Sequence, residues 1–120
     1  MLIALWIVNI VLALMMLMAG TMKTLTPKAK IEQKMPWAED FSAGQIKAIG
    51  ITEFIGGLGL ILPLATGILP ILTPIAAVGL VIIMIGAIVV HVRRKEGFTP
   101  ALVQGVLATA SAVLGFLVVL

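Results

Sequence analysis

The stretch TPIAAVGLVIIMIGAIVVHVRRK, residues 73–95, decides the fold class of this chain. It contains no charged residue from Thr73 to Val92, and the basic run Arg93-Arg94-Lys95 follows at once. An apolar helix of about 20 residues is long enough to cross a bilayer. Basic residues directly after such a run are typical of the membrane surface. The stretch therefore predicts a transmembrane helix that ends at a charged interface.

Three further segments have the same character. The chain has 120 residues, of which 62% are hydrophobic and 11% charged, whereas a soluble domain carries roughly 25% charged residues. We therefore predict an all-α fold, an integral membrane four-helix bundle that forms a single domain over residues 1–120, with lipid as its solvent. A short interfacial segment, residues 23–42, is expected between the first two helices. The four helices are expected at about residues 2–22, 43–65, 74–92 and 100–120.

Helix starts are marked by local patterns. Ser42 and Gln45 have the spacing of a capping box, which opens the second helix. Thr73-Pro74 and Thr99-Pro100 each combine an N-cap residue with a proline at the first helical position, and predict the starts of the third and fourth helices. Thr26-Pro27 predicts a short helix inside the interfacial segment. No Lys or Arg precedes the first apolar run, so we expect residues 2–22 to be retained as a helix and not cleaved as a signal peptide.

The charges are distributed unevenly along the chain. Every Lys and Arg lies in or beside the first and third connections, and the second connection and both termini carry none. The positive-inside rule then places both termini outside, and we expect a bacterial cytoplasmic membrane protein. The net charge of +3 is not arranged as a basic stripe with interleaved aromatic residues, so no nucleic-acid partner is expected. A chain with one His and no Cys offers no metal site.

Glu53 is the one charged residue inside an apolar run. It lies about eight residues into the second helix, roughly 12 Å from its charged end at about 1.5 Å per residue. A carboxylate at that depth costs at least ~2.5 kcal/mol, so it should face the bundle interior and have a partner, or be protonated. Gly56 and Gly57 share its helix face, where they admit either a neighbouring helix or a flat ligand.

Polar residues of the other three helices lie in the same half of the membrane. Lys23 ends the first helix and His91 lies near the end of the third, where a positive charge also complements the helix dipole without any function. Gln104 lies about one turn into the fourth. The candidate ligand-binding residues are therefore Glu53, His91, Lys23, Gln104, Gly56 and Gly57. They form no self-contained catalytic constellation, and whether the protein is an enzyme stays open.

Other polar residues have a structural interpretation. Asn9 in the first helix and Ser111 in the fourth lie on polar stripes that favour interhelical hydrogen bonds. Trp37 follows a proline in the interfacial segment, and an indole suits the headgroup zone.

Three stretches resemble the DoxX-like family of small four-helix membrane proteins: residues 20–23 (GTMK), 50–63 (GITEFIGGLGLILP) and 74–96. The family takes its name from a subunit of an archaeal thiosulfate:quinone oxidoreductase. Related bacterial proteins are linked to quinone and thiol stress, and distant relatives resemble receptor-assembly chaperones. Because this chain has no Cys, it departs from the members that handle thiols.

The resemblance leaves two main hypotheses of function. In the first, the protein binds a flat lipophilic molecule, quinone-like, near Glu53 as part of a membrane redox system; the cofactor itself is unknown. In the second, it is a non-enzymatic assembly protein that holds a partner membrane protein or forms a homo-oligomer. Proton-coupled transport through Glu53 has the least support, because the sequence shows no inverted repeat.

Overall fold

The computed structural model describes residues 1–120 and consists of helices joined by short connections. Each of the four long helices is long and apolar enough to cross a membrane, which confirms the predicted fold class. Two short helices, α2 and η1, lie between the first two long ones. The elements are α1 (Leu2–Leu25), α2 (Lys28–Lys34), the 3-10 helix η1 (Pro36–Asp40), α3 (Ala43–Thr66), α4 (Leu72–Arg93) and α5 (Thr99–Val119).

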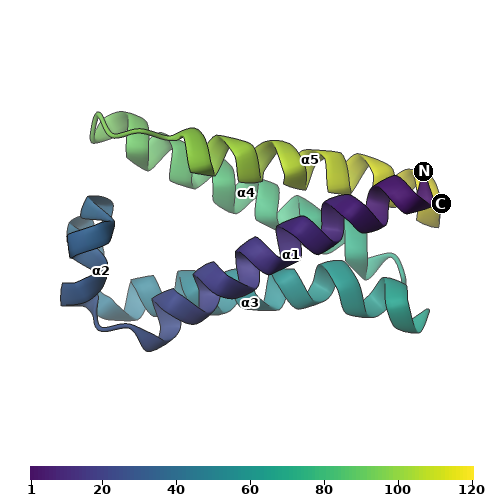
Figure 1. Cartoon of the computed structure of the whole chain (residues 1–120), viewed down its shortest axis with the longest axis horizontal. Coiled ribbons are helices and arrows are strands. Elements are labelled where there is room, and N and C mark those ends of the chain that lie inside the picture. Colours follow the sequence, from purple (N-terminus) through teal and green to yellow (C-terminus); the bar gives the residue numbers. More distant parts are fainter.

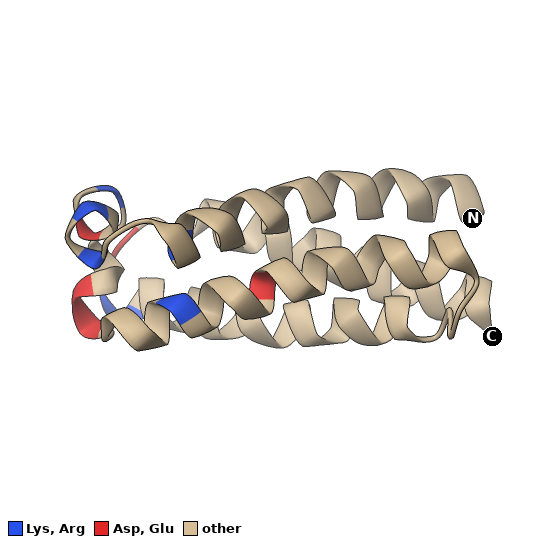
Figure 2. Ribbon diagram, turned by 90° about the horizontal axis from the view of Figure 1, so that it is seen from below, with Lys and Arg blue, Asp and Glu red and all other residues tan.

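The long helices lie roughly along the longest dimension of a molecule that measures 42 × 26 × 17 Å. α1 packs along α3 and α4 packs along α5 (Figure 1). Both termini lie at one end of the bundle, and α2 and the α4–α5 connection lie at the other. Figure 2 shows Lys, Arg, Asp and Glu gathered toward the end remote from the termini. The charged residues that cluster in the sequence therefore also lie toward one end of the folded bundle.

The outer surface of the bundle is apolar and its interior contains polar groups. Large aliphatic side chains such as Ile3 and Ile82 are 78% and 65% exposed. In contrast, the side chains of Asn9, Glu53 and Ser111 are buried. A water-soluble protein does not expose contiguous apolar surface on this scale. The distribution fits a molecule that is surrounded by lipid along its four spans.

The helix starts agree only in part with the local patterns. The capping box of α3 is confirmed, because Gln45 N donates to Ser42 Oγ at 3.1 Å and Ser42 N donates to Gln45 Oε1 at 2.9 Å. The predicted N-caps Thr73 and Thr99 are wrong. α4 begins at Leu72 after a turn, in which the backbone N–H groups of Leu72 and Thr73 already donate to carbonyls three residues earlier. α5 likewise begins at Thr99, after Phe98.

The interfacial segment folds onto the beginning of α3. The predicted short helix is present as α2, and η1 follows it directly. Ile31 of α2, Ala38 of η1 and Ile46 of α3 form a small buried cluster. Trp37 and Phe41 pack against this cluster, with their ring centroids 5.5 Å apart. The cluster thereby fixes Trp37 at the charged end of the bundle.

Candidate functional site

An ion pair between Lys23 and Glu53 lies inside the bundle. The Lys23 Nζ donates to the Glu53 Oε1 at 2.5 Å. The Glu53 side chain is 1% exposed and that of Lys23 is 12% exposed. The lone carboxylate of α3 therefore faces inward and has a partner on α1. A charged pair in a membrane span is costly to place there, and such pairs mark functional sites or strong interhelical links.

Glycines let α1 and α3 approach closely at this point. A Cβ on Gly20 would lie 2.5 Å from the Gly50 carbonyl oxygen, and a Cβ on Gly50 would lie 2.8 Å from the Lys23 Cβ. The stem of Lys23 therefore crosses the α3 backbone where that helix has no side chain. From there its ammonium reaches Glu53, one turn further along α3. The close crossing is what makes this ion pair geometrically attainable.

Trp37 connects this ion pair to the third span. The Lys23 Nζ lies 5.4 Å from the Trp37 ring centroid, a cation–π contact. The Trp37 ring is also edge-on to the His91 ring, with centroids 6.4 Å apart and an interplanar angle of 82°. His91 thus reaches the ion pair through the indole, and its own polar contact is with Glu96, at 3.4 Å from Nδ1 to Oε2. The ligand-binding residues predicted from the sequence do not include Trp37, although a tryptophan in the interfacial segment indicates a position at this end of the bundle.

Arg94 ties the α4–α5 connection to η1. Its Nε donates to Glu96 Oε1 at 2.7 Å, and its Nη1 donates to Asp40 Oδ2 at 2.8 Å. The hydrogen bond to Glu96, followed by that to Asp40, raises the pKa of the Arg94 guanidinium further above its ordinary value. The same hydrogen bond from Arg94 lowers the pKa of the Glu96 carboxyl below its ordinary value of 4.5. A charged network at the membrane surface therefore holds the two connections together.

The remaining predicted residues lie apart from the ion pair or are covered. A Cβ on Gly56 would lie 2.8 Å from Leu80 of α4, so that glycine faces a neighbouring helix. A Cβ on Gly57 would lie 3.2 Å from Leu17 of α1. Both glycines are therefore occupied by helix packing. Gln104 is half-buried on α5, and its side chain makes no hydrogen bond within the chain.

A second buried polar cluster lies nearer the termini. The Asn9 Nδ2 donates to the Leu60 carbonyl oxygen at 2.9 Å, and the Ser111 Oγ donates to Asn9 Oδ1 at 2.5 Å. These bonds join α1, α3 and α5, and they confirm the predicted interhelical role of Asn9 and Ser111. Pro63 lies in α3, one turn after Leu60, and has no N–H to donate to its own helix. The buried Thr73 hydroxyl has no hydrogen-bond partner.

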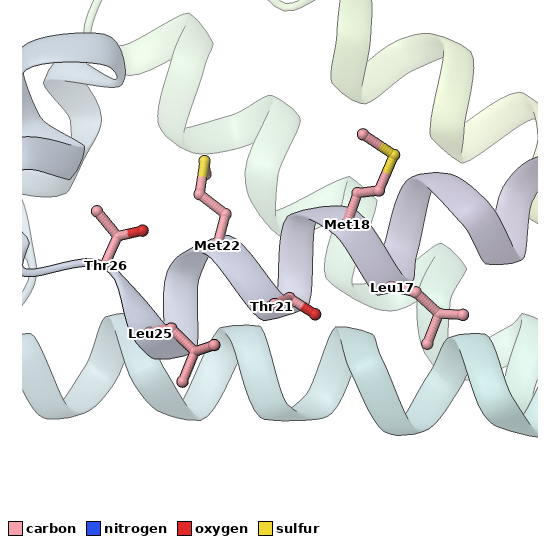
Figure 3. Close-up of a pocket in the computed structure, with 6 residues that line it drawn as sticks. All are labelled: Leu17, Met18, Thr21, Met22, Leu25 and Thr26. Carbon is pink, nitrogen blue, oxygen red and sulfur yellow. The ribbon is translucent and has the colours of Figure 1, made fainter.

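Two open pockets lie on the surface of the spans. The first, of about 580 Å³, is formed by α1 alone (Figure 3) and is lined by Leu17, Met18, Thr21, Met22, Leu25 and Thr26. Figure 3 shows the Met18 and Met22 side chains projecting from the same side of α1. The second pocket, of about 710 Å³, is a groove between α4 and α5. Neither pocket is lined by Glu53, and no three His, Asp or Glu side chains gather as a metal site.

Comparisons with known proteins identify a family but no individual relative. No curated protein and no solved structure matches the chain. The DoxX-like family matches residues 7–114, which include all four spans except the ends of the first and last. This chain, a bundle of four apolar helices around a buried Lys–Glu pair, therefore belongs to the DoxX-like family.

Proposed function

We propose that this protein binds a flat lipophilic molecule, quinone-like, whose polar head lies at the Lys23–Glu53 pair. The observation that carries the proposal is the ion pair itself, since it places an ammonium and a carboxylate inside an apolar bundle. Charged residues in a span cost ~2.5–3.5 kcal/mol each on insertion scales. A purely structural link between two helices can be made from neutral groups, as the Asn9–Ser111 bond demonstrates in this chain.

The Lys23 ammonium supports the recognition of a carbonyl group. One of its N–H groups is directed to Glu53, and its other donors are free within the chain. Its side chain is 12% exposed, so a ligand atom can approach it. Charge-assisted hydrogen bonds of this type are shorter and stronger than neutral ones. A quinone carbonyl would supply an acceptor oxygen for the free N–H groups of this ammonium.

The aromatic neighbours support the recognition of a flat ring. Trp37 lies over the ammonium, and His91 lies edge-on to Trp37. Aromatic rings favour offset-stacked and edge-to-face contacts with other rings.

The test is a titration with decylubiquinone in detergent. The chain has two tryptophans, so a Trp6→Phe background leaves Trp37 as the single fluorophore. We expect saturable quenching of Trp37. The double variant Lys23→Met/Glu53→Leu removes both charges together and leaves neither one unpaired, so it should fold while it binds on the order of tenfold more weakly. Lys30→Met removes an exposed charge of α2 and is the matched control. Equal affinity in the double variant and the control would refute the proposal.

One observation favours a second candidate function, that of a membrane assembly protein. Gly79 and Gly86 lie seven residues apart on the exposed side of α4, and a Cβ at either position would meet nothing within 4 Å. Small residues at such spacing allow a second helix to approach closely. Crosslinking from Ile82→Cys in native membranes should then capture a specific second chain, and Gly79→Leu/Gly86→Leu should abolish the product. An unchanged product in that variant would exclude this face.

A further inference from the structure

The groove between α4 and α5 lies away from the Lys23–Glu53 pair and has a defined chemistry. Its volume is about 710 Å³, and α4 contributes Val81, Met84, Ile85 and Ile88 to its lining. The α5 side runs from Leu102 to Leu114, where Gly105 and Ala110 leave room. The single hydroxyl in the lining, of Thr109, donates to the Gly105 carbonyl oxygen at 2.8 Å. The groove thus offers no free side-chain hydrogen-bond donor, and its lining suits a hydrocarbon occupant.

The length of the groove matches one leaflet. Leu102 and Leu114 are separated by roughly 18 Å of helix at about 1.5 Å per residue. The hydrocarbon core of a bilayer is about 30 Å thick, so one leaflet measures roughly 15 Å. Leu102 lies within the first turn of α5, at the charged end of the bundle. A groove that starts at the membrane surface and ends near the midplane suits the acyl chain of a lipid.

Unpaired positive charges lie at the same end of the bundle as Leu102, where the groove begins. Arg93 and Lys95 belong to the end of α4 and the α4–α5 connection, both are exposed, and neither forms an ion pair. The first turn of α5 adds backbone N–H groups of Thr99 and Ala101 that have no hydrogen-bond partner within the chain. Free N–H groups at a helix N-terminus also favour an anion. The charge here is complementary to a phosphate.

From this juxtaposition we propose that an anionic phospholipid binds the α4–α5 groove, with one acyl chain between the helices and its phosphate between Arg93, Lys95 and the start of α5. A second copy of the chain fits this face less well. A copy in the same orientation would bring its own Arg93 and Lys95 to the same depth, and like charges at close range repel. The lipid instead supplies both the hydrocarbon and the counter-charge.

The experiment compares lipid retention by native mass spectrometry. Protein delipidated in a neutral detergent is titrated with dimyristoyl phosphatidylglycerol and, in parallel, with dimyristoyl phosphatidylcholine. We expect the anionic lipid to be retained at a concentration on the order of tenfold lower, given the attraction of two basic residues to an anionic headgroup. Equal retention of the two lipids overturns the proposal.

Variants separate the two halves of the site. Arg93→Gln/Lys95→Asn should remove the preference for the anionic lipid, and asparagine tolerates the left-handed φ of 57° at position 95. Ala110→Phe fills the groove and should weaken both lipids while the charges stay in place. The matched controls are Lys30→Gln/Lys34→Gln, which removes two exposed charges of α2, and Ile82→Phe, which enlarges an exposed side chain of α4 outside the groove. If either control loses as much lipid as its partner variant, binding is non-specific and the proposed site is wrong.

Discussion

Replacing Lys23 with methionine leaves the Glu53 carboxylate inside the bundle without its counter-charge. The Glu53 side chain is 1% exposed, so water cannot take over the role of the ammonium. Removing one partner of a buried ion pair costs about 3–5 kcal/mol of folding free energy. We expect a loss of this size in Lys23→Met, because methionine preserves the length of the side chain but provides no donor.

The opposite single substitution should cost less. In Glu53→Leu the Lys23 ammonium remains, but its side chain is 12% exposed and long enough to bend toward the membrane surface. It also keeps its contact with the Trp37 ring. We therefore expect a loss of about 1–2 kcal/mol. The double variant Lys23→Met/Glu53→Leu contains no stranded charge and should regain most of the loss, since apolar replacements of a buried pair are often neutral or stabilising.

The assay is reversible unfolding by SDS in mixed detergent micelles, followed by circular dichroism. The measured quantity is the coupling energy of the double-mutant cycle, which isolates the interaction between the two side chains. Lys30→Met controls for the loss of one positive charge and should unfold like the wild-type chain. Strictly additive single substitutions, or a Lys23→Met variant as stable as the wild type, would show that the pair contributes nothing to folding and would refute this account.

Three further predictions concern other parts of the bundle. Gly50→Ala places a Cβ 2.8 Å from the nearest atom of α1 and should lower stability by about 1–3 kcal/mol in the same unfolding assay. Unchanged stability would mean that α1 and α3 can move apart without cost. Asn9→Leu removes two interhelical hydrogen bonds and should cost about 1 kcal/mol; adding Ser111→Ala should cost little more, and a full second loss would mean that the two groups act independently. The hydrogen bond from Arg94 lowers the pKa of Glu96, so the stability that this contact contributes is present above pH 4.5 and is lost as the pH falls through the lowered pKa. The protection factors for hydrogen exchange in η1, which are corrected for the intrinsic pH dependence of exchange, should therefore fall on acidification, and an equal fall in Arg94→Gln would contradict the assignment.

Much of the architecture could be predicted because it depends on local sequence. The cost of placing charge in hydrocarbon confines Lys, Arg, Asp and Glu to one end, with Glu53 as the exception, and this holds whatever the helices do. The capping box at Ser42 was also predictable, since its hydrogen bonds join residues three apart. The start of α4 could not be predicted in the same way. The turn before it already provides backbone hydrogen bonds, so α4 begins before Thr73 and the Thr73 hydroxyl has no partner.

The sequence by itself determined that this is a four-span membrane protein with a polar end and one buried carboxylate. Only the tertiary structure decided which residue meets that carboxylate. Apolar residues surround each span on all sides, so hydrophobicity does not mark an inward face, and rotation about the helix axis stays undetermined until the helices pack. Packing through Gly20 and Gly50 selected Lys23 as the partner of Glu53, covered Gly57 with α1, and left His91 behind Trp37.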